Sequence, residues 1–289
     1  MTIAIVTGSS TGIGLAVALG LARAGHTVYG TMRNPKRAPA LAQTAKEEGL
    51  PVHVIAMDVD SDVSVSSGIA KIIEEAGTVD ILINNAGIAP LGSIEEMPLS
   101  GFREVMETNY FGLLRCTQAV LPTMRRQKSG VVVNISSVAG RNAVSPNGAY
   151  SGSKFAVEGL SEILCQEMWS FGGRVAVIEP GLVKTAILGK MLGDEEEVQS
   201  HYPSVARLRA YYKAGEADAA EPEEVWHAIQ KFLDSDDGTL RHPVGKDVVG
   251  VLPMRHQMSD EDWNNVCTIQ DDDEWRAMMK ATYDLDIAL

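Results

Sequence analysis

The chain of 289 residues has no apolar run long enough to span a bilayer, and no basic leader precedes a small-residue cleavage site. These absences predict a cytoplasmic protein with no transmembrane segment. Only three cysteines occur, Cys116, Cys165 and Cys267, at unrelated spacings that argue against a disulfide framework. No His-x3-His or Cys-x2-Cys pattern occurs either, so the sequence predicts no metal site.

Basic side chains are scarce, with 25 Lys and Arg against 38 Asp and Glu and a net charge of −13. Residues 1–193 carry 16 of each sign, so the acidic excess lies in residues 194–289. This balance argues against a nucleic-acid partner, because a phosphate backbone requires a basic footprint. Carboxylates are absent before Glu47, whereas five basic side chains precede it. That local positive field predicts an anionic ligand near the N-terminal end.

Apolar runs rich in β-branched residues alternate with stretches of helical periodicity. The predicted strands are 2–7, 27–32, 52–57, 80–84, 130–136 and 174–179. The predicted helices are 13–24, 38–48, 62–76, 100–127, 150–171 and 221–234. This order predicts an α/β fold, a doubly wound Rossmann-type parallel sheet with helices on both faces. We expect one domain over 1–289, with a mobile loop-and-helix insertion at 182–220 and a C-terminal tail at 250–289.

A glycine-rich turn follows the first strand, where Thr7-Gly8 continues through Gly12-Ile13-Gly14 into the helix predicted at 13–24. Such a turn lets backbone N–H groups approach a pyrophosphate at the positive end of the helix. The spacing differs from the general Gly-x-Gly-x-x-Gly fingerprint, and glycine is also the usual residue of tight turns. Its position directly between strand and helix favours a dinucleotide site.

The tip of the second strand selects between the two nicotinamide dinucleotides. A carboxylate there would accept hydrogen bonds from the adenosine ribose and favour NAD. The chain instead has Arg33, followed by Lys36 and Arg37, and a guanidinium can bind a 2′-phosphate bidentately. Ser10 in the glycine turn can donate a further hydrogen bond. We therefore predict NADP, with NAD the less favoured cofactor; the other interpretation of Arg33 is a solvated charge that stacks on adenine.

Tyr150 and Lys154 lie four residues apart on a predicted helix, so the phenol and the ammonium share one face. A neighbouring cation lowers the pKa of a phenol from about 10, and a value near 7 requires roughly 4 kcal/mol of differential interaction. Such a phenol is a general acid and base at neutral pH. Ser137, thirteen residues before Tyr150, could hydrogen-bond the same reacting oxygen, with Ser136 as the competing serine. The other interpretation of Tyr150 and Lys154 is a surface pair.

Taken together, the motifs resemble the short-chain dehydrogenase/reductase family. The matching positions, in order over residues 1–190, are Thr7-Gly8-x3-Gly12-x-Gly14, Asp58, Asn84-Asn85-Ala86-Gly87, Asn109, Ser137, Tyr150-x3-Lys154, Pro180-Gly181 and Thr185. The segments 28–33, 150–160 and 252–255 are similar to the branch that holds hydroxysteroid and retinol dehydrogenases. That branch is mostly NADP-dependent and acts on hydrophobic alcohols and ketones. The sequence departs from it after residue 190, where the substrate lid normally forms.

The resemblance implies a role for each matching residue. Tyr150 would donate and accept the proton, while Lys154 would lower its pKa and bind the nicotinamide ribose. Ser137 would hold the substrate oxygen. Asn109 would anchor a water in a proton relay to Lys154; the other interpretation is a helix-interior amide satisfied by neighbouring backbone. The cofactor would be bound by Gly8, Ser10, Gly12, Ile13, Gly14, Arg33, Asp58, Val59, Asn85, Ala86, Gly87, Tyr150, Lys154, Pro180, Gly181, Val183 and Thr185.

These expectations define an NADP(H)-dependent oxidoreductase that interconverts a neutral hydrophobic secondary alcohol and its ketone. The alternatives are an NAD-dependent alcohol dehydrogenase of the same family, a non-redox epimerase or dehydratase, and a cofactor-sensing relative. The candidate pocket residues are Val138, Ala139, Val144, Pro146, Leu182, Ile187, Leu188, Met191, Leu192 and Tyr211, with Met254, Met258, Met278 and Met279 as a cap. Relatives associate through the helices corresponding to 100–127 and 150–171, so the resemblance also implies a homodimer or homotetramer.

Overall fold

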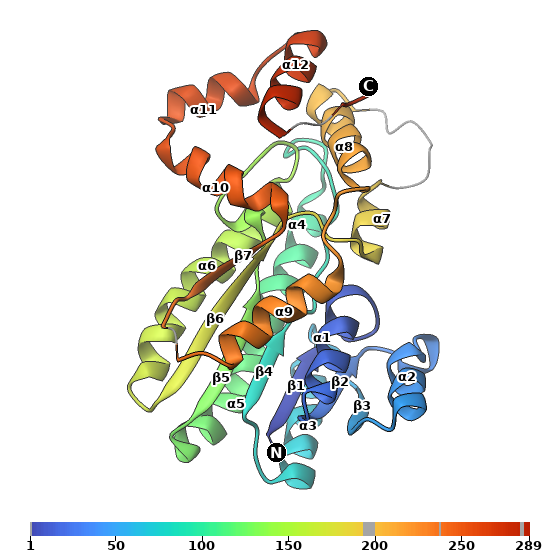
Figure 1. Cartoon of the computed structure of the whole chain (residues 1–289), viewed down its shortest axis with the longest axis vertical. Helices are drawn as coiled ribbons and strands as arrows, with labels where there is room; N and C mark the ends of the chain where they lie inside the picture. The colour runs from blue at the N-terminus through green and yellow to red at the C-terminus, as the bar shows by residue number, and fades with distance from the viewer. Residues whose placement is uncertain (1, 193–199, 237, 284–285) are drawn as a thin grey trace.

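The computed structural model describes residues 2–192, 200–236, 238–283 and 286–289. In that part of the chain seven parallel strands form one sheet, in the order β3-β2-β1-β4-β5-β6-β7 (Figure 1). The strands are β1 (Ile3–Thr7), β2 (Thr27–Met32), β3 (Val52–Ala56), β4 (Ile81–Asn84), β5 (Gly130–Ile135), β6 (Gly173–Pro180) and β7 (Arg241–Val244). The strand order reverses between β1 and β4, so the predicted doubly wound sheet is confirmed. Open α/β sheets bind ligands at such a reversal, beyond the carboxyl ends of the strands.

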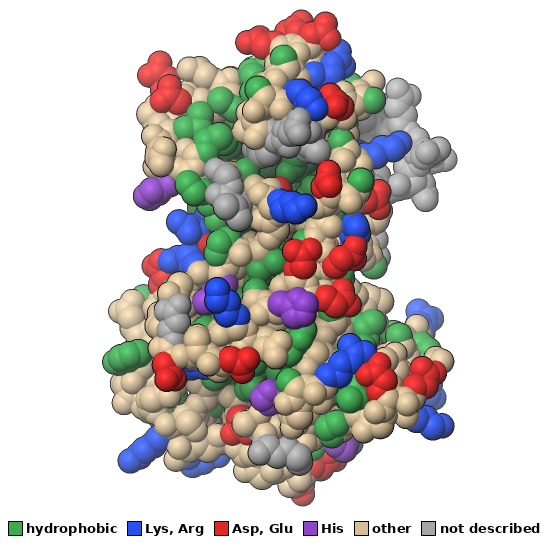
Figure 2. Space-filling model, in the orientation of Figure 1, with side chains coloured by type: hydrophobic (Ala, Val, Ile, Leu, Met, Phe, Trp, Pro, Cys, Tyr) green, Lys and Arg blue, Asp and Glu red, His purple; other side chains and the backbone are tan. Residues whose placement is uncertain are grey.

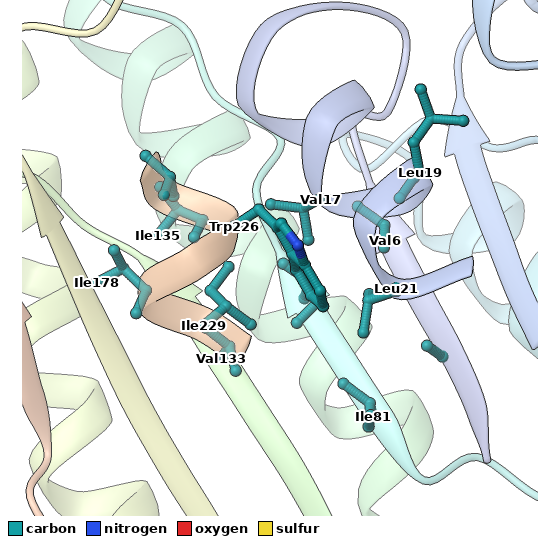
Figure 3. Packing of buried hydrophobic residues seen from close by; sticks show 14 of the residues in the cluster. Val6, Val17, Leu19, Leu21, Ile81, Val133, Ile135, Ile178, Trp226 and Ile229 are labelled. Carbon is teal, nitrogen blue, oxygen red and sulfur yellow. The ribbon is translucent and has the colours of Figure 1, made fainter. Parts of the chain in front are cut away.

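Helices cover both faces of the sheet because its central strands are apolar on both sides. One face carries α1 (Gly12–Arg23), α2 (Ala40–Glu48) and α9 (Pro222–Leu233), and the other carries α3 (Asp62–Ala76), α5 (Leu113–Gln127) and α6 (Gly148–Trp169). Figure 3 shows Trp226 of α9 reaching toward Val17 and Leu21 of α1. A Cβ at Gly20 would overlap the Trp226 ring, so glycine at this position lets α1 and α9 pack closely.

The structure differs from the sequence prediction in three places. Strand β7 was not predicted, because Arg-His-Pro-Val is short and lacks an apolar run. The helix predicted over 100–127 is α4 (Leu99–Met106), a π-helical turn over Glu107–Gly112, and then α5. The tail predicted at 250–289 forms three helices, α10 (Lys246–Gln257), α11 (Asp260–Cys267) and α12 (Asp272–Tyr283).

The C-terminal helices α10 to α12 cover the carboxyl ends of the strands together with α7 (Ala186–Leu192) and α8 (Pro203–Gly215) (Figure 1). Arg207 of α8 fastens this cap, since it pairs with Asp272 and donates to the carbonyl oxygens of Ile269 and Gln270. In Figure 2 apolar side chains gather among the helices of the cap, while acidic side chains lie along its outer edge. Among the described residues, no helix is both long and apolar enough to cross a membrane.

Candidate active site

The glycine turn between β1 and α1 is shaped by contacts that exclude larger side chains. Gly8 has a φ of +64°, and a Cβ there would lie 2.8 Å from the Cα of Ala86. A Cβ at Gly14 would overlap both the Gly8 carbonyl oxygen and the Asn85 side chain. At Gly12, with φ +55°, a Cβ would lie 2.9 Å from Thr185. The three glycines therefore bring the β1, β4 and β6 loops together at the N-terminus of α1, where a diphosphate would be stabilised.

Asn85 holds the loop after β4 against this turn. Its side-chain amide donates to the carbonyl oxygens of Thr7 at 2.9 Å and Gly8 at 3.1 Å. The Thr7 hydroxyl in turn accepts from the backbone amides of Asn85 at 3.0 Å and Ala86 at 3.1 Å. The segment 85–87 is thus placed beside the glycine turn, and its contact with the adenosine ribose stays a prediction.

The predicted adenosine end lies beyond the tips of β2 and β3. Arg33 is exposed directly after β2, on the same edge of the sheet as the partly exposed Ser10. Asp58 follows β3 and accepts from the amide of Asp60 at 3.2 Å. The Val59 side chain is buried in the core, so only its backbone is available to a ligand. These positions form an open polar surface that carries the exposed Arg33 guanidinium, close enough to the Asp60 carboxylate for the two charges to attract.

Tyr150, Lys154 and Ser137 are brought together at the carboxyl ends of β5 and β6. Tyr150 and Lys154 lie on the first turns of α6, with the Lys154 Nζ 5.5 Å from the centre of the Tyr150 ring. Lys154 also donates to the Ile135 carbonyl oxygen at 2.8 Å, which fixes the ammonium at the end of β5. Ser137 hydrogen-bonds the Tyr150 phenol, and its hydroxyl lies 3.3 Å from the Pro180 carbonyl oxygen. All three side chains line one cavity.

The pKa of Tyr150 corrects one sequence prediction. We expected Lys154 to lower it, yet burial raises the pKa of Tyr150, and the hydrogen bond from Ser137 offsets this only in part. Burial also lowers the pKa of Lys154 to about 8, against the attraction of Glu158 one helical turn away. The expectation was wrong because it ignored desolvation, which disfavours both charged forms. In the described chain the phenol is therefore a protonated acid at neutral pH, beside a lysine that is still mostly charged.

Asn109 sits on the π-helical turn, a feature often found at functional sites. Its amide donates to the Ile88 carbonyl oxygen at 2.9 Å and to the Ser153 hydroxyl at 3.0 Å, and its oxygen accepts from the Ile88 amide at 2.8 Å. Ser153 in turn donates to the Tyr150 carbonyl oxygen at 2.7 Å. Asn109 thus joins the loop after β4 to the helix that carries Tyr150. These contacts match the alternative of an amide satisfied by neighbouring groups, and leave the proposed relay to experiment.

A residue that sequence reasoning missed secures the loop after β6. The Asp247 carboxylate, at the start of α10, accepts from the Leu182 amide at 2.9 Å, and burial raises its pKa. A Cβ at Gly181 would overlap this carboxylate. Val183 and Thr185, predicted to contact the cofactor, follow on the same loop and line the cavity. No sequence motif links residues 65 positions apart, so only the fold shows this contact.

The cavity above Tyr150 has a volume of about 470 Å³ and mostly apolar walls. Of the predicted lining residues, those that lie on it are Val138, Ala139, Val144, Leu182, Ile187, Leu188, Met191, Tyr211, Met254, Met258, Met278 and Met279. Pro146 is not among the lining residues that the structure describes; it is buried, and its carbonyl oxygen accepts from the Gly92 amide at 3.3 Å. The side chain of Leu192 lies outside the described residues.

Sequence reasoning also missed the aromatic residues of the cap. Trp263 and Trp275 line the cavity from α11 and α12. A signal for the second was present, because Trp275, Met278, Met279 and Thr282 recur at i, i+3, i+4 and i+7, the spacing of one helix face. All four line the cavity, so helical periodicity would have identified the tail as part of the site.

Comparison with known proteins agrees with this geometry. The family model of short chain dehydrogenases matches residues 2–196. Human retinol dehydrogenase 8 is 36% identical, over 82% of this chain and 79% of its own, and human 17-beta-hydroxysteroid dehydrogenase type 1 is 33% identical, over 88% and 80%. The crystal structure of a short-chain dehydrogenase from Streptomyces avermitilis superposes with a TM-score of 0.79 at 31% identity, over 97% of this chain and 98% of that one.

The fold and the site thus define the class of NAD(P)-dependent oxidoreductases. Within that class the chain belongs to the short-chain dehydrogenase/reductase family, as its motifs predicted.

Proposed function

We propose that this protein is an NADP(H)-dependent oxidoreductase that interconverts a neutral hydrophobic secondary alcohol and its ketone. The observation that carries this proposal is the convergence of Ser137, Tyr150 and Lys154 on an apolar cavity that begins beside the glycine turn. Bound NADPH supplies the hydride, and the protein supplies position and a proton. Two relatives, retinol dehydrogenase 8 and 17-beta-hydroxysteroid dehydrogenase type 1, carry names that fit such substrates.

In the reducing direction, the carbonyl oxygen is held between the hydroxyls of Ser137 and Tyr150. Tyr150 donates its proton as negative charge develops on that oxygen, so the two hydroxyls stabilise charge present chiefly in the transition state. Its raised pKa keeps the phenol protonated and ready to donate at neutral pH. Lys154 holds the nicotinamide ribose and its charge stabilises the phenolate that remains.

The cavity favours a neutral substrate because the two buried cations on its described walls are already engaged: Lys154 donates to the Ile135 carbonyl oxygen and is assigned to the nicotinamide ribose, and Arg207 is held by the cap. Arg207 is 9% exposed, and its guanidinium makes four hydrogen bonds, two to Asp272 and one to each of two backbone carbonyl oxygens. An anionic substrate would find no free positive charge on the described part of this wall. The methionines and tryptophans of the cap provide adaptable apolar contacts.

Arg33 sets the cofactor preference in this proposal. A charge-assisted contact is worth about 1.5–3 kcal/mol, so Arg33→Ala is expected to lower kcat/KM for NADPH by about 10- to 100-fold. The same variant should leave kcat/KM for NADH within about twofold, which is the internal control. Steady-state kinetics with both cofactors measures this. A wild-type preference for NADH, or no loss with NADPH in the variant, would contradict the assignment.

The rate of ketone reduction should fall as the pH rises through about 8, where Lys154 loses its proton. Below that pH the ammonium is present, and above it the rate should decrease by about tenfold per unit, while the phenol, with its raised pKa, stays protonated. The measurement is kcat at saturating NADPH across the pH range, with circular dichroism showing that the protein stays folded. A flat profile through pH 8 to 10 would show that the Lys154 charge is not required.

The proposed reaction is tested by incubating the protein with NADPH and a panel of hydrophobic ketones. A reductase consumes NADPH in proportion to alcohol formed, whereas an epimerase, a dehydratase or a cofactor sensor causes no net oxidation. We expect NADPH to be consumed with at least one apolar ketone and not with matched keto acids.

We also propose that the protein is a homodimer or homotetramer that works in the cytoplasm. Exposed apolar side chains on the π-helical turn and on α6, Phe111, Phe155, Ile163 and Trp169, support a surface covered by a second copy. Three free cysteines support a reducing compartment. Sedimentation equilibrium tests the oligomeric state, and a monomer would contradict the proposed dimer or tetramer. Fractionation of cells tests the cytoplasmic location.

A further inference from the structure

A cluster of charged side chains lies beside the helix that carries Tyr150 and Lys154. Glu158 follows Lys154 by one turn of α6, and each of the two residues is 5% exposed. Residues four apart share one face of a helix and lie roughly 6 Å apart along its axis. A Cβ at Gly140 would lie 3.1 Å from both the Glu158 Cγ and the Lys154 carbonyl oxygen, so glycine lets the short turn after Ser137 pack directly against α6.

Arg241 holds the Glu158 side chain in this position. Its Nε donates to Glu158 Oε2 at 2.9 Å and lies 3.7 Å from Glu179 Oε1, and the guanidinium also pairs with the exposed Glu162. Glu179 is 1% exposed, and burial raises its pKa. Arg241 comes from β7, so the edge strand supplies the cation of this cluster. A guanidinium at hydrogen-bond distance keeps the buried Glu158 carboxylate in its charged form.

The Lys154 ammonium is buried one turn from this carboxylate. Its printed hydrogen bond is to the Ile135 carbonyl oxygen, a neutral partner. Burial lowers the pKa of Lys154 to about 8, and the charge of Glu158 opposes this. Glu158 Oε1 has no hydrogen-bond partner in the described part of the chain. The Glu158 charge is thus only partly neutralised by Arg241, and it acts on Lys154 through an interior of low dielectric constant.

Other titratable groups surround this end of α6. Those on the elements packed against it are Arg103, Glu104, Glu107, Arg141, Glu179 and Arg241, and those on the cavity wall are Tyr150, Arg207, Tyr212, Asp247 and Cys267. Burial raises the pKa of both tyrosines, of the aspartate and of the thiol, which disfavours their charged forms. Glu107 and the other arginines form ion pairs of their own, while Arg103 and Glu104 are exposed. Glu158 is therefore the carboxylate placed to stabilise the Lys154 charge.

From these contacts we propose that Glu158, held by Arg241, is a positioning residue that keeps the Lys154 side chain charged during ketone reduction. Glu158 is not among the described residues that line the cavity, so it acts through Lys154 and not on the substrate. This inference rests on the proposed function, in which the Lys154 charge stabilises the phenolate. It adds the residue that offsets the cost of burying that charge.

Glu158→Gln tests the proposal because it removes the charge and keeps the size of the side chain. The measured quantity is kcat for ketone reduction at pH 8 divided by kcat at pH 6, at saturating NADPH. Loss of the opposite charge should make the ammonium about tenfold more acidic, so this ratio should be about fivefold lower than in the wild type. A variant that is merely less stable loses rate at both pH values and keeps the ratio.

Glu162→Gln is the matched control. Glu162 also pairs with Arg241, but its side chain is 53% exposed. It lies roughly 12 Å from Lys154 along α6, beyond the screening length of about 8–10 Å. This variant should keep the wild-type ratio, and Glu158→Asp, which retains the charge, should keep it within about twofold. An unchanged ratio in Glu158→Gln, or an equal fall in Glu162→Gln or Glu158→Asp, overturns the proposal.

NMR titration of the protein, isotope-labelled at the ε-carbon of lysine, gives a second test that does not depend on activity. The Lys154 signal is the one missing from Lys154→Arg, and its midpoint should lie at lower pH in Glu158→Gln than in the wild type. Glu158→Met replaces this variant if the glutamine variant does not fold. An equal midpoint overturns the proposal. If the wild type reduces no ketone, the proposed function falls, while the NMR midpoint still decides whether Glu158 keeps Lys154 charged.

Discussion

Tyr150→Phe is expected to lower kcat for ketone reduction by about 10³-fold or more while the dissociation constant for NADPH changes by less than about twofold. The phenol, which its raised pKa keeps protonated, is the proposed proton donor, and loss of a general acid typically costs 10²- to 10⁴-fold. Phenylalanine keeps the ring that lines the cavity, so cofactor and substrate still bind. Single-turnover kinetics and calorimetric titration with NADPH separate the two effects.

Tyr212→Phe is the matched variant for this test. The Tyr212 phenol is buried on the same cavity, and burial raises its pKa above the usual range, with Tyr150 adding to the effect. If Tyr150 is the proton donor, the Tyr212 variant should keep its activity within about tenfold. Appreciable turnover in the Tyr150 variant, combined with loss of activity in the Tyr212 variant, would show that Tyr150 is not the proton donor.

Gly14→Ala is expected to raise the dissociation constant for NADPH by about 10- to 100-fold and to destabilise the fold by about 1–3 kcal/mol. The new methyl group would overlap the Gly8 carbonyl oxygen and the Asn85 amide. Backbone atoms cannot move aside as a flexible side chain can, so the turn that would bind the diphosphate must distort. Calorimetric titration and urea unfolding measure the two effects.

The control for this change is Gly189→Ala on the exposed surface of α7. A Cβ at Gly189 meets no atom of the described chain within 4 Å, and alanine has the higher helix propensity. The variant should be more stable by up to about 1 kcal/mol and should bind NADPH like the wild type. NADPH binding by the Gly14 variant that equals that of this control would show that the turn does not hold the cofactor.

Sequence periodicity predicted the six apolar strands and the helices between them, because burial on both faces requires continuous apolar runs. It missed β7 because strand pairing with β6, and not composition, forms that element. It also described α10 to α12 as a tail, although the periodicity around Trp275 carried the signal of a buried face. Local patterns therefore describe the sheet well and the cap poorly, since the cap is defined by tertiary contacts such as Arg207 with Asp272.

The residues of the candidate site also fall into those that sequence motifs predict and those that only the fold reveals. The motifs identified Ser137, Tyr150 and Lys154, and the fold brings these three together on one cavity. Sequence patterns could not identify Asp247, because its contact with Leu182 joins segments 65 positions apart. It also misjudged the pKa of the phenol, because the extent of burial is a property of the folded chain.

The most direct measurement is transfer of deuterium from NADPH labelled at C4 of the nicotinamide to an apolar ketone. We predict that the label from one of the two C4 epimers appears on the carbinol carbon of the product, with one NADPH oxidised for each alcohol formed. Two results would contradict hydride transfer from NADPH. One is conversion of a substrate without oxidation of NADPH, and the other is an unlabelled alcohol from both C4 epimers of the labelled cofactor.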